Sequence, residues 1–87
     1  MSTETIPVRI MVHEAWDEVE LDFPAATPVE QVKRRALELT HVSEPAEIFE
    51  VKYRGAAILD EGASLEAAGV VPNAALIVLR RRRSPVR

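Results

Sequence analysis

The stretch VELDFPAATPVEQVKRRALEL (residues 19–39) contains two different periodicities within one short segment, and their order decides the fold. Val19, Leu21 and Phe23 alternate with acidic residues, which is the period-two pattern of a strand with one buried face. Proline at position 24 ends that strand because it has no amide hydrogen for the sheet. From Val29 onward the apolar residues recur every three or four positions, as in an amphipathic helix. We therefore expect a strand at 17–23 followed by a helix.

The helix is expected to run from Pro28 to about Thr40 or His41. Thr27, Pro28 and Glu30 form a helix-start signal, in which the threonine hydroxyl and the glutamate complete a capping box. Lys33 is placed with the charged residues of the solvent-facing side. The apolar stripe of the opposite side consists of Val29, Val32, Ala36, Leu37 and Leu39.

The flanking segments predict four more strands. Residues 7–13 alternate in the same way as 17–23, and the short connection favours an antiparallel hairpin. Residues 48–53 predict a third strand after a break at Pro45, Ile58 and Leu59 a short fourth strand, and residues 76–79 a fifth. Residues 64–69 predict a single helical turn that buries Leu65.

Length and composition limit the class of protein. The chain has 87 residues, enough for one domain with one core, and its hydrophobic content of 47% is typical of a globular protein. It has no cysteine, which excludes disulfides and a thiol nucleophile. Neither an apolar leader nor a long apolar stretch is present, which predicts a cytoplasmic protein without a membrane span. Nine arginines against two lysines favour a bacterial source.

The net charge of −3 hides an asymmetry. Residues 1–79 contain six basic against 14 acidic side chains, whereas residues 80–87 contain five arginines and no acid. Such a run is typical of a solvated, frayed tail, and its functional interpretation is an electrostatic contribution to binding from Arg80, Arg81, Arg82 and Arg83.

Two motifs resemble the ubiquitin-like proteins. TPVEQVKRRAL (residues 27–37) is similar to the helix start of that family, and YRGAAILDEGASLEAAGVVPNAALIVLRRRR (residues 53–83) to its C-terminal half. The resemblance implies an α+β fold of the β-grasp type, a mixed five-stranded sheet with one helix packed across it. It divides the chain into an N-terminal extension (1–6), a ubiquitin-like domain (7–80) and a basic flexible tail (81–87). It also implies that Lys33 pairs with Asp60 or Glu61.

The sequence differs from the conjugating members of that family near the C-terminus. Those members end in Arg-Gly-Gly, but Ser84 and Pro85 stand at the aligned positions and no glycine follows Gly69. We therefore expect a protein-interaction module, an adaptor or accessory subunit, that binds without covalent attachment. A modifier or carrier conjugated through its C-terminus is one alternative, and binding of nucleic acid or an anionic surface through the arginine run is a less favoured one.

The partner is expected to be another protein of unknown identity, bound by a monomer or a weak dimer. In ubiquitin the recognition patch lies on the uncovered face of the sheet, and Lys52 here stands where that patch has its central isoleucine. Trp16 in the first turn either covers the sheet edge with its ring or is an exposed anchor, since tryptophan is enriched at binding hot spots. The predicted contacts are Met11, Trp16, Lys52, Arg54, Ile77 and Leu79.

No catalytic, cofactor-binding or metal-binding residue is predicted, and the chain is not expected to be an enzyme. No serine lies in a nucleophile-elbow motif, and three glycines are too few for a phosphate-binding loop. His13 and His41 are isolated histidines without neighbours at metal-ligand spacing.

Overall fold

Strands β1 (Thr5–Val12) and β2 (Asp17–Pro24) form the antiparallel hairpin that their alternating apolar residues predict. The computed structural model of the protein describes residues 5–81. Strand β1 begins at Thr5, inside the segment assigned to an extension, because Ile6 packs into the core and only 7% of it is exposed. The short 3-10 helix η1 (His13–Ala15) connects the two strands.

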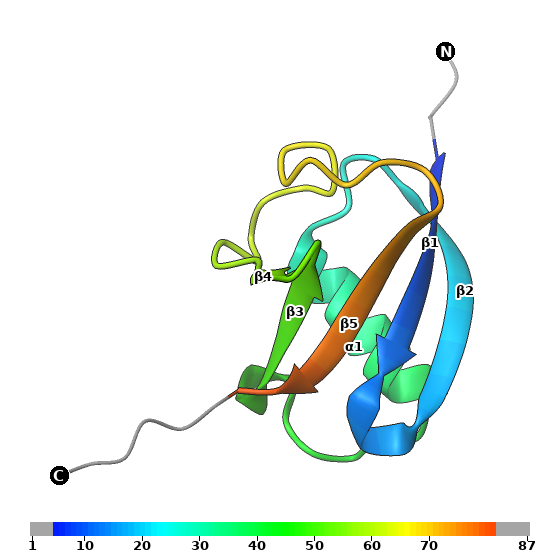
Figure 1. The fold of residues 1–87 in the computed structure, drawn as a ribbon, viewed down its shortest axis with the longest axis vertical. Helices are drawn as coiled ribbons and strands as arrows, with labels where there is room; N and C mark the ends of the chain where they lie inside the picture. The colour runs from blue at the N-terminus through cyan, green and yellow to red at the C-terminus, as the bar shows by residue number, and fades with distance from the viewer. Residues whose placement is uncertain (1–4, 82–87) are drawn as a thin grey trace, which may run out of the picture.

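Helix α1 (Val29–Leu39) packs across one face of the sheet (Figure 1). The predicted capping box is wrong, because the N-cap is Pro28 and no side chain caps the helix. Instead, the backbone N–H of Val29 donates to the carbonyl of Ala63 at 3.0 Å, and that of Glu30 donates to the carbonyl of Glu61 at 2.8 Å. A distant loop thus satisfies the orphan amide groups that begin every helix.

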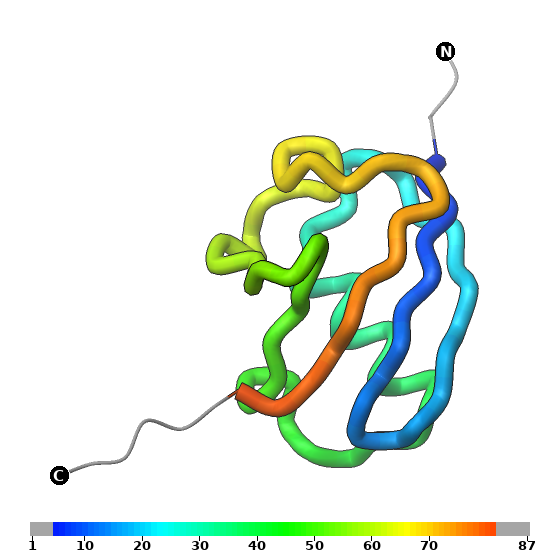
Figure 2. The backbone as a smooth tube through the Cα atoms, viewed as in Figure 1, coloured from blue at the N-terminus to red at the C-terminus, as the bar shows by residue number. Residues whose placement is uncertain are grey.

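The remaining strands are β3 (Phe49–Tyr53), β4 (Ala56–Ala57) and β5 (Ala74–Arg80), with the 3-10 helix η2 (Ala46–Ile48) preceding β3. The sheet order is β2-β1-β5-β3-β4. Strands β1 and β5 are parallel and the other pairs antiparallel, so the sheet is mixed. Figure 2 shows β5, in orange, returning between β1 and β3. The predicted β-grasp architecture is confirmed.

The predicted fourth strand is misplaced. Arg54 and Gly55 both adopt left-handed backbone conformations, with φ of 57° and 81°, and they turn the chain at once so that Ala56 and Ala57 pair with β3. The following Leu59 is 90% exposed and belongs to no strand. By contrast, the helical turn over 64–69 is confirmed, since Ala68 donates to the carbonyl of Ser64 at 2.9 Å and Leu65 is fully buried.

One hydrophobic core lies between α1 and the sheet. The predicted inward residues of β2 are only partly buried because β2 is an edge strand. The expectation that Lys33 faces solvent is wrong, because only 2% of this residue is exposed. The largest fully buried side chains besides Lys33 are Val8, Ile10, Val12, Val29, Val32, Phe49, Val51, Leu65, Leu76 and Val78.

Candidate functional site

The face of the sheet opposite α1 brings three of the predicted contact residues into one row. Met11 on β1 pairs with Ile77 on β5, and Ile77 pairs with Lys52 on β3. Their neighbours in each strand are buried against the helix, so strand alternation directs these three side chains to the uncovered side. Leu79 lies two residues farther along β5 on the same side. We call this surface the open face.

The apolar part of the open face is a narrow strip formed by Met11, Ile77 and Leu79. Ile77 is 42% exposed, while Met11 and Leu79 are half-buried. Such a strip is small compared with the apolar patches of established protein interfaces, but it continues across two adjacent strands.

Charged side chains border this strip, and within residues 5–81 none of them forms an ion pair. Strand β2 contributes Glu18, Glu20 and Asp22, all exposed, β1 contributes Arg9 opposite Glu20, and β3 contributes Glu50 and Lys52. The seven ion pairs of the described chain lie on α1, around the loop at Glu61 and at the end of β5. The charged side chains of the open face therefore form no ion pair with any described part of the protein.

Trp16 lies in the turn at the end of the β1–β2 hairpin and is 77% exposed. Its backbone is left-handed, with φ of 54°, a conformation that is uncommon for a bulky side chain. The indole ring contacts the imidazole of His13, with 5.3 Å between the ring centroids. The side chain contributes little to the core and projects from the same hairpin that carries Met11.

Arg54 is not brought together with the other predicted contacts. Its guanidinium carbon lies 5.2 Å from the centroid of the Tyr53 ring. Because Tyr53 precedes Arg54 and follows Lys52 in the chain, strand alternation places its ring on the opposite side of the sheet from Lys52. The positive charge of Arg54 is thereby drawn away from the open face.

Arg80 is the last residue of β5, and its side chain is engaged within the protein. Its guanidinium donates to Glu14 at 3.0 Å and also contacts Glu44. The same group lies over the Phe49 ring, 5.7 Å from its centroid. Hydrogen bonding to Arg80, assisted by its charge, lowers the pKa of Glu14, and the bonds to Glu14 and Glu44 raise the pKa of Arg80.

Arg81 is also held by the folded domain. Its backbone N–H donates to the Ile48 carbonyl at 2.8 Å, and its Nε donates to the Glu47 carbonyl at 3.0 Å. A terminal nitrogen of its guanidinium lies 3.3 Å from Oε2 of Glu61. The other two arginines of the predicted electrostatic run, Arg82 and Arg83, lie outside the described residues.

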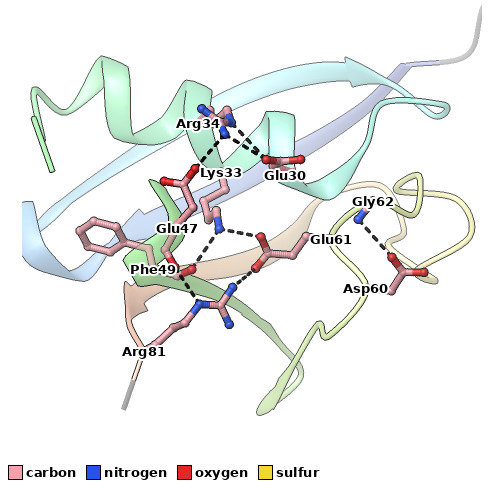
Figure 3. A network of polar contacts seen from close by, with 9 residues as sticks. All are labelled: Glu30, Lys33, Arg34, Glu47, Phe49, Asp60, Glu61, Gly62 and Arg81. Atoms are coloured by element: carbon pink, nitrogen blue, oxygen red, sulfur yellow. Dashed lines mark hydrogen bonds and ion pairs between the residues drawn. The ribbon is translucent and has the colours of Figure 1, made fainter. Parts of the chain in front are cut away.

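Glu61 also binds Lys33, which joins three parts of the chain (Figure 3). The Lys33 Nζ donates to Oε1 of Glu61 at 2.6 Å and to the Phe49 carbonyl at 3.0 Å. This confirms the pairing that the family resemblance implies and identifies Glu61, not Asp60, as the acid. It also explains why the lysine is buried, since the two acceptors compensate for lost hydration.

Other kinds of site find no support in the part of the chain that the structure describes. Between residues 5 and 81, no group of three or more histidine, aspartate or glutamate side chains has the arrangement of a metal site. His13 lies in η1 and His41 in the turn after α1, and both are exposed. None of the helices in this part is long and apolar enough to cross a membrane.

Two features of the surface are not predicted by the sequence pattern. Leu59 is the most exposed large apolar side chain within residues 5–81, whereas the pattern Ile58-Leu59 predicts that it belongs to a strand. The acidic residues of β2 alternate with apolar ones as in any half-buried strand, and only the strand register shows that Glu18 continues the row of Met11 and Ile77.

No protein-family model matches this sequence, and a search of curated proteins found no significant match. Solved structures with a ubiquitin-like fold do match. The ubiquitin of Caldiarchaeum subterraneum is 18% identical, with a TM-score of 0.75 over 94% of this chain and 100% of that one. The C-terminal ubiquitin-like domain of mouse tubulin-specific chaperone E is 18% identical, with a TM-score of 0.76 over 99% and 96%.

A third match is the ubiquitin-like domain of Dsk2 from Plasmodium falciparum, which is 23% identical with a TM-score of 0.72 over 90% of this chain and 100% of that one. At such low sequence identity, these structural matches establish the fold and nothing about function. The protein has a ubiquitin-like fold, and function must be argued from its surface.

Proposed function

We propose that this protein is a non-enzymatic interaction module that binds another protein through the open face without covalent attachment. The observation that carries the proposal is the row of Met11, Ile77 and Lys52, an apolar strip on an uncovered sheet with neighbouring charges unpaired within residues 5–81. A partner gains apolar contact there and supplies the missing opposite charges.

Trp16 supports the same proposal from the hairpin end. A bulky residue in a left-handed conformation costs backbone free energy, and an indole that is 77% exposed regains little of it by burial. Residues that remain strained and exposed are favoured as functional positions, and tryptophan is a frequent hot spot. We include Trp16 as an anchor beside the strip.

The two alternatives are less well supported. A modifier or carrier would need a slim C-terminus, whereas Ser84 and Pro85 occupy the positions where conjugating relatives carry glycines. Binding of nucleic acid would use the four arginines of the run. Two of them, Arg80 and Arg81, are already engaged with Glu14, Glu44 and Glu61. The acidic row of β2 would repel phosphates as well.

The test compares Ile77→Glu with Val71→Glu. Both residues are apolar and similarly exposed, at 42% and 46%, but Val71 lies in the loop before β5 and away from the open-face row. Proteins captured from the source-organism lysate are quantified for the wild type and both variants. We expect Ile77→Glu to reduce the recovery of specific partners by about tenfold or more and Val71→Glu to leave it unchanged. Equal recovery with both variants would remove the open face from consideration.

A further inference from the structure

A pocket with mostly apolar walls lies beside β4, the short strand at the edge of the sheet (Figure 1). Its volume is about 470 Å³, and it is lined by five alanines together with Tyr53, Ile58 and Asp60. The hydroxyl oxygen of Tyr53 is buried and has no hydrogen-bond partner within residues 5–81. A buried polar group without a partner is unfavourable, so this wall of the pocket is incomplete in the isolated chain. We call it the β4 pocket.

Leu59 projects beside the β4 pocket and does not fill it. Its two neighbours in the chain, Ile58 and Asp60, line the pocket, whereas Leu59 is not among the lining residues and is 90% exposed. A leucine side chain loses free energy by leaving water for apolar surroundings. The same surface therefore presents an apolar projection and, next to it, an apolar hollow that this projection does not occupy.

Charges of both signs accompany the projection and the hollow. Asp60 lines the pocket, and its carboxylate accepts a hydrogen bond from the backbone of Gly62 at 3.2 Å. The guanidinium of Arg54 lies over the ring of Tyr53, another lining residue. Neither Asp60 nor Arg54 forms an ion pair within residues 5–81, and both are exposed. A surface with these two complementary pairs of features is complementary to itself.

We propose that the β4 pocket binds a second copy of this chain in a two-fold symmetric dimer. Leu59 of each copy enters the pocket of the other, and Arg54 of each copy pairs with Asp60 of the other. The carbonyl of Leu59, which accepts no hydrogen bond within residues 5–81, arrives with the side chain as an acceptor for the Tyr53 hydroxyl. A two-fold contact uses the same patch on both copies and closes at two, so it builds no fibre.

The second copy is favoured over an unrelated partner because this chain already supplies every complementary group at the required spacing. The contact is also separate from the open face, since strand alternation directs Tyr53 to the opposite side of the sheet from Lys52. With one leucine per copy as the main apolar contact, the dimer should be weak, with a dissociation constant of about 0.1–1 mM.

Sedimentation equilibrium of the full chain at concentrations up to about 1 mM measures this constant. We expect Leu59→Glu to weaken self-association by about tenfold or more, because it removes the apolar insertion from both copies. Val71→Glu is the matched control, since Val71 is an exposed apolar loop residue that does not line the β4 pocket. Val71→Glu and Ile77→Glu should both leave the constant unchanged, which distinguishes this contact from the open face.

Exchanging the charges tests the two-fold arrangement itself. Arg54→Asp places two acids at each reciprocal contact and Asp60→Arg places two arginines there, so each variant alone should self-associate about two- to tenfold more weakly than the wild type. An equimolar mixture of the two variants restores an opposite-charge pair at both contacts. We expect it to associate within about twofold of the wild type. Circular dichroism establishes that each variant is folded.

Three outcomes would overturn the proposal. One is a wild type that stays monomeric up to about 1 mM. The second is a dimer that Leu59→Glu leaves intact or that Ile77→Glu abolishes, since the contact would then lie elsewhere. The third is a mixture of the charge variants that associates no more tightly than its components. None of these results affects the capture of partners that tests the proposed function, so the two can fail separately.

Discussion

Trp16 combines two unfavourable properties at a single residue. A left-handed backbone places the Cβ of an L-residue too near the following carbonyl, at a cost of about 1–2 kcal/mol. The φ of 54° places Trp16 in this region, and its 77% exposure means that its ring is not required to fill the core. Stability alone would favour glycine at this position.

Comparing two substitutions of Trp16 separates the backbone cost from the loss of the ring. Trp16→Gly and Trp16→Ala both remove the indole, but only glycine relieves the left-handed strain. We expect Trp16→Gly to be more stable than Trp16→Ala by about 1 kcal/mol in equilibrium urea denaturation, and both to bind the partner less tightly.

Ala75, which is exposed in the extended strand β5, is the control for this comparison. There the change to glycine should instead destabilise the protein, by about 0.5–1 kcal/mol, because it only adds freedom to the unfolded chain. If Trp16→Gly were no more stable than Trp16→Ala, the strain argument would fail.

At the scale of elements, the end of β5 joins two connections that are far apart in sequence. Arg80 reaches Glu14 in η1 and Glu44 in the segment between α1 and η2, and it covers the ring of Phe49 at the start of β3. Together these contacts close one end of the sheet over the core. An arginine that the sequence alone assigns to an electrostatic run therefore has a structural role.

The Arg80 contacts predict that stability depends on pH in a defined direction. The hydrogen bond from Arg80 holds the pKa of Glu14 below its ordinary value in the folded protein. A lowered pKa stabilises the fold at neutral pH, and this contribution disappears as the pH falls through the lowered value. We therefore expect Arg80→Gln to lower Tm at about pH 7 and to lower it less at about pH 3.

Two variants check the assignment of that effect. Glu14→Gln removes the titrating partner, so its Tm difference from the wild type should also shrink in acid. Glu66→Gln removes a carboxylate that forms no ion pair within residues 5–81 and should show no such trend. A Tm difference for Arg80→Gln that stayed constant or grew in acid would contradict the role of Glu14.

At the scale of the whole molecule, Lys33 connects the helix to two other parts of the fold, the loop at Glu61 and the start of β3. Its Nζ binds Glu61 from the loop that caps α1 and the carbonyl of Phe49 that begins β3, while Glu61 also accepts from Arg81 (Figure 3). With 2% of Lys33 and 12% of the Glu61 side chain exposed, the pair is largely removed from water. Buried pairs of this kind are costly to break from one side.

We expect Lys33→Met to lower the free energy of unfolding by about 3 kcal/mol, because Glu61 is left with only the more exposed Arg81. The double variant Lys33→Met/Glu61→Leu should recover most of that loss, since it leaves no unpaired buried charge. Urea denaturation measures both. Arg35→Met, which breaks an exposed pair with Glu38, is the control and should cost about 0.5 kcal/mol or less. A double variant no more stable than Lys33→Met would contradict this account.

Sequence alone was sufficient for the order of the elements and for the sides of the strands. Local hydrogen bonding sets a period of two in strands and 3.6 in helices, so the residues of β1, β3 and β5 could be divided into core and surface before any contact was known. The prediction that Met11, Ile77 and Lys52 are contact residues followed from this division together with the family resemblance. Their alignment in one row became definite only with the strand register.

Tertiary structure decided what depends on residues distant in sequence. The cap of α1 comes from the carbonyls of Glu61 and Ala63, the burial of Lys33 requires an acid 28 positions away, and Arg80 finds Glu14 at a separation of 66 positions. A periodic pattern describes only neighbours within one element. The acceptors that bury a lysine or bind an arginine are supplied by the packing of separate elements, and this is why those roles were not evident from sequence alone.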